Sequence, residues 1–584
     1  MADKPLLIFD GKCGFCRIWI EYCRKLTDDR LEYAPSQEVG RQHPEIPPER
    51  YSQSVQLVLP SGQVLAGARA VFTTLTFAPE MAWLLWAYDH VPGFAPITEA
   101  AYRTIAANRS FFYQVTRFTL SRDVSPLRYN RVEWIFLRAL ALIYFSAFAS
   151  FGLQAAGLIG ERGILPAGRY LDAVRTMFGV SGLWMMPTVF WIAHSDAVLK
   201  AGCAAGAVIS IVLLFGYFER TALVLLYILY LSLCTVGQDF MSFQWDMLLL
   251  EAGFLAIFLG SSKIVILLFR WLLFRLMFLS GAVKLMSHDL AWRHLTAMSY
   301  HYMTQPLPTP LAWYMYQLPM GFQKASTFAV FVIELGVPFL IFAPRLWRYF
   351  GAACLTGLQL LIFLTGNYTF FNLLAIALSL FLLDDSVLRW GGQSRPRRTF
   401  SSGTIVLAAL ILLLSALELS EMFFGADSSL VRLAAPFGIV NTYGLFAVMT
   451  TTRQEIVVEG SNDGENWLPY QFPFQPGDLN RAPRWVAPYQ PRLDWQMWFA
   501  ALSRGQVPPW FENLMVRLLQ GSPPVLGLMK TNPFPAAPPK YVRALLFDYS
   551  FTTFPERHAT GDWWRRKPLG LYFPQISLDD VRMR

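Results

Sequence analysis

Cysteine is scarce in this chain and stops early. Only six cysteines occur among 584 residues, and none follows Cys354. They are Cys13, Cys16, Cys23, Cys203, Cys234 and Cys354. Because the long C-terminal part has no cysteine, disulfides cannot hold it together, which excludes a small disulfide-stabilised scaffold.

Charge is also sparse. Asp, Glu, Lys and Arg make up 15% of the residues, whereas soluble domains carry roughly 25%. Hydrophobic residues make up 54%, which indicates an integral protein of a lipid bilayer. The net charge of +9 does not indicate a nucleic-acid partner, because much of it lies in short loops between apolar runs, where Lys and Arg set membrane topology.

The beginning of the chain lacks the apolar core of a signal peptide. It reads Met-Ala-Asp-Lys-Pro, so we expect the N-terminal part to stay in the cytoplasm. A C-x-x-C pair in that compartment is more often redox-active or metal-binding than structural.

A dithiol stands at the head of the chain. The apolar run Pro5 to Phe9 ends at Asp10, and Cys13-Gly-Phe-Cys16 leads into a helical segment. This order predicts a strand, a turn and a helix whose N-terminus holds Cys13. Unpaired backbone N–H groups and the helix dipole stabilise a thiolate there, so the pair is suited to thiol–disulfide exchange, in which one sulfur attacks and the other resolves.

Other interpretations of these residues remain open. The cysteines could be small buried residues or half of a zinc site, but zinc needs a second pair. The region offers only Cys23, His43 and His90 at unsuitable spacing, so we expect neither a metal nor a cofactor. Asp10 either accepts a proton from the resolving thiol or ends the strand and caps the helix.

Residues 1–125 are predicted to form a soluble α/β domain. A short strand at 31–34 follows the first helix, and segments 54–59 and 63–66 flank Pro-Ser-Gly as a hairpin. This order is thioredoxin-like. Asp10, Cys13 and Cys16, with Tyr102 to Arg109 near the end of the domain, resemble the DCC family of thiol-disulfide oxidoreductases over roughly the first 115 residues. The resemblance implies Cys13 as nucleophile and Cys16 as resolving thiol, with a cytoplasmic dithiol or disulfide partner.

Residues 126–425 are predicted to form a polytopic helical domain of about nine spans. The apolar runs lie at 134–158, 196–215, 220–237, 245–260, 264–286, 327–343, 349–365, 367–383 and 404–424. Cations before the first run and in the alternate loops place the N-terminus inside and the C-terminus outside; among them are Arg128, Arg131, Arg220, Lys263, Arg345 and Arg348. Residues 426–584 return to soluble composition and predict a β-rich domain on the far face.

Several polar side chains fall within or beside the apolar runs. They are Asp246, Glu251, Lys284, Glu334, Asn367 and Asn372. Such groups are costly in a bilayer and face a partner or a cavity. They either pair structurally, for instance Glu251 with Lys284, or line a ligand, quinone or catalytic site. Cys203 and Cys234, both toward the outer face, are either a thiol relay or small packing residues.

These regions also resemble the lipase maturation factor family over roughly residues 130–575. The resemblance rests on Gly237 to Glu251, Ser280 to Leu285, Tyr300 to Trp313, Gly366 to Asn372, Asn441 to Phe446, Glu459 to Gly464 and Pro488 to Trp495. It implies help with the folding or assembly of secreted lipases. Animal members sit in the endoplasmic reticulum membrane with a lumenal C-terminal region. The stretch around Lys284 is also similar, more distantly, to the catalytic-lysine region of vitamin K-dependent γ-carboxylases.

Animal members of that family are not built with a DCC-type head, so the fusion predicts a bacterial inner-membrane protein with a periplasmic C-terminal domain. Two functions follow. One is a membrane-bound thiol-disulfide oxidoreductase that helps exported client proteins to fold. The other is a non-enzymatic chaperone or assembly factor whose head only senses redox state.

Overall fold

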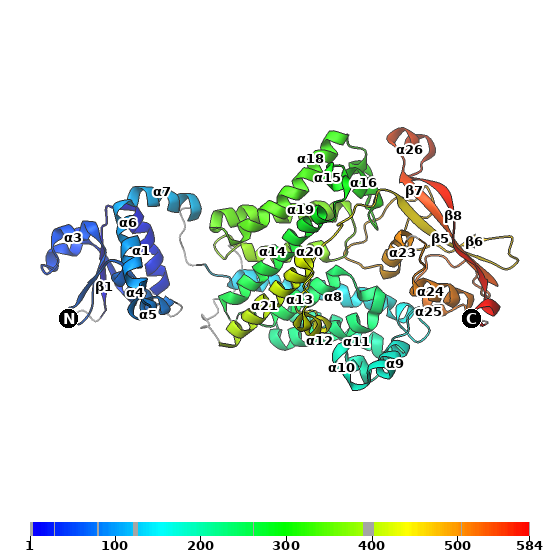
Figure 1. Ribbon diagram of the computed structural model, residues 1–584, viewed down its shortest axis with the longest axis horizontal. Helices are drawn as coiled ribbons and strands as arrows, with labels where there is room; N and C mark the ends of the chain where they lie inside the picture. Colours follow the sequence, from blue (N-terminus) through cyan, green and yellow to red (C-terminus); the bar gives the residue numbers. More distant parts are fainter. Residues whose placement is uncertain are drawn as a thin grey trace.

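Three regions follow one another along the long axis of the computed structural model (Figure 1). The structure describes residues 4–27, 30–78, 81–120, 127–260, 262–388, 402–503 and 505–582. The N-terminal domain lies at one end, the long apolar helices fill the middle, and the C-terminal sheet lies at the opposite end.

The N-terminal domain has the predicted order of strands and helices. Its four-stranded sheet runs β2-β1-β3-β4, with β1 parallel to β2 and antiparallel to β3. Leu7, Ile20 and Leu57 pack in its core. The strands are β1 (Leu6–Phe9), β2 (Glu32–Pro35), β3 (Gln56–Val58) and β4 (Val64–Ala66). The helices are α1 (Gly14–Thr27), α2 (Ser36–Val39), α3 (Pro48–Gln53), α4 (Gly67–Thr76), α5 (Trp83–His90), α6 (Phe94–Ala107) and α7 (Arg109–Leu120).

Seven helices among the described residues are long and apolar enough to cross a membrane. They are Asn130–Leu158, Asp196–Leu214, Glu219–Met241, Lys263–Met286, Met320–Phe342, Arg345–Thr365 and Gly403–Phe424. They correspond to α8, α11, α12 with η5 (Gln238–Met241), α14, α18 with η6 and η7, α19 and α21 (Ser402–Phe424). Glu334 lies in a π-helical turn, η6 (Val332–Gly336), between α18 (Met320–Phe331) and η7 (Val337–Phe342).

The predicted count of nine spans is not confirmed. The runs at 245–260 and 367–383 form shorter helices, α13 (Gln244–Ala256) and α20 (Phe371–Ser379), the latter followed by η8 (Leu380–Leu382). Most residues of both helices are buried. A helix surrounded by protein need not match the hydrocarbon thickness, so a buried position permits this short length.

Short helices connect the spans. They are α9 (Ala167–Phe178), α10 (Gly182–Met185), α15 (Leu290–Arg293), α16 (Ala297–Thr304) and α17 (Pro310–Tyr316). Thr309 caps α17 by accepting a hydrogen bond from the Ala312 amide, the usual role of threonine at this position.

The C-terminal region contains one antiparallel sheet of order β6-β5-β7-β8, with helices packed against it. The expected strands are present, but α23 and α24 are additional helices that the β-rich prediction missed. The strands are β5 (Arg453–Ser461), β6 (Leu468–Pro469), β7 (Tyr541–Phe551) and β8 (Trp564–Ser577). The helices are α22 (Ser429–Ala434), α23 (Arg492–Leu502), α24 (Pro509–Leu519), α25 (Pro523–Leu526), α26 (Phe554–Thr560) and α27 (Leu578–Arg582). One hydrophobic cluster runs from Leu249 of α13 to Leu514 of α24 and Val542 of β7, so the C-terminal region shares a core with the helical body.

Candidate functional site

The dithiol lies where β1 turns into α1. Helix α1 begins at Gly14, directly after Cys13. The Cys16 amide donates a hydrogen bond to Cys13 Sγ at 3.4 Å, and the Arg17 amide donates to the Cys13 carbonyl at 3.0 Å. The first turn of the helix therefore directs a backbone donor at the Cys13 sulfur. Both side chains are partly exposed, so a partner disulfide can approach.

Asp10 holds the turn before the dithiol. Its Oδ1 accepts hydrogen bonds from the Lys12 amide and the Gln37 side chain, both at 3.0 Å. Its Oδ2 lies 3.9 Å from an Arg109 guanidinium nitrogen. These contacts fit the strand-ending role better than helix capping, because the bonded amide precedes α1. Proton acceptance from Cys16 stays a prediction.

The surroundings of Cys16 disfavour its thiolate. Burial, followed by the hydrogen bond and charge of Cys13, raises the pKa of Cys16 to about 12. The charge of Arg109 opposes this rise, and that of Asp10 adds to it. Arg109 begins α7, so the segment from Tyr102 to Arg109 returns to the dithiol, where the Tyr102 hydroxyl also accepts a hydrogen bond from the Val55 amide.

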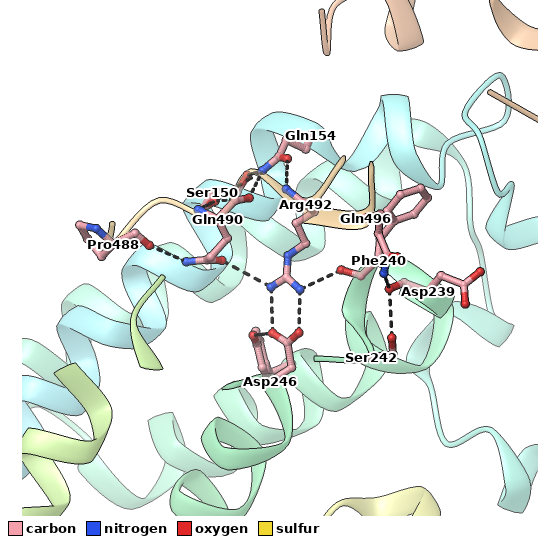
Figure 2. Close-up of polar contacts among 11 residues, drawn as sticks. Ser150, Gln154, Asp239, Phe240, Ser242, Asp246, Pro488, Gln490, Arg492 and Gln496 are labelled. Atoms are coloured by element: carbon pink, nitrogen blue, oxygen red, sulfur yellow. Dashed lines mark hydrogen bonds and ion pairs between the residues drawn. The ribbon is translucent and has the colours of Figure 1, made fainter. Parts of the chain in front are cut away.

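Asp246 joins the helical body to the C-terminal region. It stands in the first turn of α13 and forms an ion pair with Arg492, the first residue of α23. The bonds measure 2.6 and 2.8 Å, and both side chains are fully buried. Tyr230 donates to the same carboxylate at 2.5 Å. Figure 2 shows the guanidinium between Asp246, Gln490 and the Phe240 carbonyl.

Glu251 does not pair with Lys284, and the sequence-based example of that pair was wrong. Glu251 pairs instead with Arg275 of α14 (Lys263–Met286), and it accepts hydrogen bonds from Tyr443 and the Asn441 amide at 2.7 and 3.0 Å. The ion pair connects α13 to α14, and the two hydrogen bonds connect α13 to the segment that follows α21.

Asn367 likewise binds the C-terminal region. Its Oδ1 accepts from the Val486 and Ala487 amides at 2.7 and 3.1 Å, and its Nδ2 donates to the Arg484 carbonyl at 2.7 Å. Three of the six predicted polar residues therefore serve the junction with the segments that follow α21.

Lys284, Glu334 and Asn372 line a separate cavity. Lys284 Nζ donates to Glu334 Oε2 at 2.7 Å and to the Ser280 carbonyl at 2.9 Å. Asn372 donates to Gln359 at 2.7 Å. All three residues border one cavity of about 250 Å³. The Lys284–Glu334 pair fits the structural-pairing alternative and the shared cavity fits the ligand-site alternative, so the ligand site stays a prediction.

The six cysteines are all free thiols. Cys203 lies in α11 (Asp196–Leu214). It packs against Gly152 of α8 (Asn130–Leu158), because a Cβ added to Gly152 would lie 3.0 Å from the Cβ of Cys203. Cys234 lies in α12 (Glu219–Gly237). The relay stays a prediction. Among the described residues, no group of three or more His, Cys, Asp or Glu side chains is arranged to hold a metal ion.

Sequence reasoning missed the partners Arg492, Arg275, Gln359 and His301. Arg492 and His301 do lie inside motifs that carry the family resemblance, at 488–495 and 300–313. Those motifs marked the residues without indicating what they contact, because the contacting residues are far apart in the chain.

Comparisons with known proteins agree with these regions. Residues 131–390 match the lipase maturation factor transmembrane domain, 439–574 the lipase maturation factor C-terminal domain, and 7–115 the DCC1-like thiol-disulfide oxidoreductase family. Lipase maturation factor 2 of Gallus gallus is 36% identical, covering 77% of this chain and 82% of its own length. The Homo sapiens protein of the same name is 35% identical over 76% and 82%.

Lipase maturation factor 1 of Bos taurus is 35% identical, covering 77% of this chain and 89% of its own length. No solved structure matches the chain. The chain belongs to the lipase maturation factor family, is an integral membrane protein, and carries a DCC1-like thiol-disulfide oxidoreductase domain at its N-terminal end.

Proposed function

We propose that this protein is a membrane-bound thiol-disulfide oxidoreductase that assists the folding or assembly of exported proteins, lipases among them. The observation that carries the proposal is the asymmetry of the dithiol. A helix-terminal amide faces Cys13 Sγ, which favours its thiolate, whereas burial keeps the proton on Cys16. Cys13 is therefore the attacking sulfur and Cys16 the resolving one.

Exchange at this pair passes through a mixed disulfide. The Cys13 thiolate attacks a disulfide sulfur, that S–S bond breaks, and a thiolate leaves. Cys16 then loses its proton and attacks Cys13 Sγ in the mixed disulfide. The partner leaves as a dithiol, reduced by two electrons, and Cys13 and Cys16 are left as a disulfide. A cytoplasmic dithiol returns the pair to its reduced form.

We place the dithiol domain in the cytoplasm and the C-terminal region on the far side of the membrane. The cations flanking the first span support this orientation, as do the odd number of long apolar helices among the described residues and the two domains at opposite ends of the molecule (Figure 1). A bacterial inner membrane rests on the fused dithiol domain alone, because the relatives named above are animal proteins.

This separation poses a transfer problem, because a client on the far side cannot touch Cys13. Electrons would pass through a relay, for which Cys203 and Cys234 are the proposed thiols. Replacing either Cys203 or Cys234 with alanine tests the relay. In the parent protein the oxidation state of the client should change with that of the Cys13–Cys16 pair, and in the variants it should not.

A second candidate function follows from the same geometry. The C-terminal region shares its core with the helical body, while the dithiol domain lies at the other end. In this alternative the C-terminal region binds clients without redox chemistry, and the head senses cytoplasmic redox state.

One experiment separates the two functions. Cys13→Ser with Cys16→Ser is introduced into the full-length chain, and the yield of an active secreted lipase is measured beside the parent protein. Cys23→Ser is the matched control, because Cys23 lies on the same helix. Loss of yield only in the double variant supports the oxidoreductase. Unchanged yield leaves the chaperone.

A further inference from the structure

The cavity bordered by Lys284 and Glu334 combines a neutralised ion pair with apolar walls. Lys284 donates to Glu334 and to the Ser280 carbonyl, and its ammonium faces the Trp292 ring at 5.2 Å. The pair carries no net charge. An ionised headgroup would therefore lose its hydration without gaining a free counter-ion, whereas a neutral ligand avoids that cost.

Two polar side chains of this cavity offer hydrogen-bond acceptors. Asn372 is 1% exposed, and its Oδ1 has no hydrogen-bond partner among the described residues. An unpaired buried amide oxygen is costly. Because its Nδ2 is held by Gln359, the amide cannot turn to satisfy the oxygen, so a ligand with a donor would remove the penalty.

His301 supplies a second acceptor. The Gln305 amide nitrogen donates to the Tyr302 and Thr365 carbonyls, so its oxygen accepts from the Tyr368 hydroxyl at 2.9 Å. The single proton of the Tyr368 hydroxyl is used in that bond, so His301 Nε2, which lies 3.2 Å away, must donate to the hydroxyl oxygen. Burial and the charge of Lys284 lower the pKa of His301 to about 4, so the ring is neutral and its Nδ1 is an acceptor.

The cavity opens toward the surface that lipid covers. Its walls come from α18, including Phe322 and the small polar Ser326, and from α19 (Arg345–Thr365), including Leu361. Phe322 is 43% exposed and Leu361 60% exposed. Helix α18 packs mainly against α16, whereas α19 packs mainly against α20 and then against η7. The mouth therefore lies between two membrane-spanning helices, where a bilayer molecule can enter sideways.

We propose that this cavity binds a neutral membrane lipid bearing a hydroxyl group, of the acylglycerol type. One hydroxyl of the glycerol headgroup donates to Asn372 Oδ1, a second free hydroxyl donates to His301 Nδ1, and the acyl chain leaves between α18 and α19. Tyr368 and Phe446 border this cavity and also a second cavity at the junction with the C-terminal region. The lipid headgroup would therefore lie beside the wall that these two residues form between the cavities. The site is separate from the dithiol.

Photo-crosslinking in nanodiscs of phosphatidylcholine tests the proposal on the full-length protein. The probe is a monoacylglycerol whose chain carries a diazirine and an alkyne, and the comparison probe is the methyl ester of the same fatty acid, which has no hydroxyl. We expect the glycerol probe to label α18 and α19 about 3- to 10-fold more strongly, the ratio that one or two neutral hydrogen bonds provide. Equal labelling by the ester would overturn the hydroxyl assignment.

Two variants locate the site. Ser326→Trp fills the cavity and should abolish the excess labelling, whereas Ala325→Trp, on the adjacent position outside the lining, should leave it intact. Asn372→Leu should lower the ratio of the two probes without lowering ester labelling, because one of the two hydrogen bonds to the headgroup is lost and the bond to His301 remains. Full labelling of Ser326→Trp would show surface labelling only and overturn the cavity. The Cys13→Ser, Cys16→Ser protein should bind normally, so failure of the redox proposal leaves this result unchanged.

Discussion

Arg492 and Asp246 form a buried, doubly hydrogen-bonded ion pair although 246 residues separate them. Arg492 also faces the rings of Phe151, Phe243 and Trp245. The pair fastens the start of α23 to the start of α13 (Figure 2). The helical body and the C-terminal region therefore depend on each other for stability.

Breaking this pair on one side should destabilise the protein strongly. Asp246→Asn leaves the Arg492 guanidinium buried without a carboxylate, which costs about 3–5 kcal/mol. The thermal midpoint of the purified protein in detergent should fall, and the C-terminal region should become sensitive to protease. Replacing both partners, Asp246→Leu with Arg492→Met, should recover much of the loss.

Asp427→Asn is the matched control, because its ion pair with Arg432 is exposed. Such a pair contributes at most about 1 kcal/mol. A midpoint shift in Asp246→Asn no larger than in Asp427→Asn would contradict the proposed role of the buried pair.

Asp494 should make stability depend on pH. Burial raises its pKa to about 7, against the hydrogen bonds from the Phe474 and Gln475 amides. The folded state thus favours the protonated carboxyl. The stability that the protonated carboxyl contributes is complete below the ordinary Asp pKa near 4 and is lost as pH rises through about 7, by at most about 1.4 kcal/mol per pH unit.

Asp494→Asn keeps an amide oxygen for those two bonds and removes the charge. The variant should be more stable than the parent protein above pH 7, and the difference should vanish near pH 4. Thermal midpoints across this range check it, with the exposed Glu465→Gln as control. A difference that does not change with pH would contradict the assignment.

The two dithiol variants should behave differently toward a disulfide substrate. Cys16→Ser retains the attacking sulfur and cannot resolve, so mixed disulfides should accumulate on Cys13. Cys13→Ser should trap little, because Cys16 holds its proton. Non-reducing gels after acid quenching measure the adducts. Equal trapping by both variants would reverse or abolish the assigned roles.

Arg109 should speed the resolving step. Its charge lowers the Cys16 pKa, so Arg109→Met should raise that pKa and slow release of a mixed disulfide about three- to fourfold for each unit of the rise, because the thiolate fraction falls while its nucleophilicity increases. The pH profile of release should move upward. Arg103→Met, an exposed arginine of α6, should leave the profile in place; a matching shift in that control would assign the effect to overall charge.

Local order made the dithiol domain predictable. Asp10, Cys13 and Cys16 lie within one turn and the next helix, and β3 and β4 are joined by a short loop, so contiguous sequence determines their geometry. The contacts of the membrane polar residues depend on how distant helices pack. Glu251 meets Arg275 rather than Lys284 because both face the segment around Asn441, which no spacing along the chain indicates.

Span length posed a related problem. Apolar composition alone cannot distinguish a helix bathed in lipid from one enclosed by protein. Most residues of α13 and α20 are buried within the protein, so their apolar composition reflects burial within the protein. Asp246 and Asn367 contact residues of the C-terminal region. The packing of that region against the helical body therefore could not be predicted from sequence either.

The reduction potential of the Cys13–Cys16 pair tests the central claim most directly. Full-length protein in its native membrane is equilibrated in defined dithiol and disulfide buffers, and the free thiols are labelled after acid quenching. We predict a reversible two-electron couple between about −120 and −270 mV, the range of known exchange catalysts. Absence of a Cys13–Cys16 disulfide at every potential would contradict the oxidoreductase and leave a membrane assembly factor with a structural head.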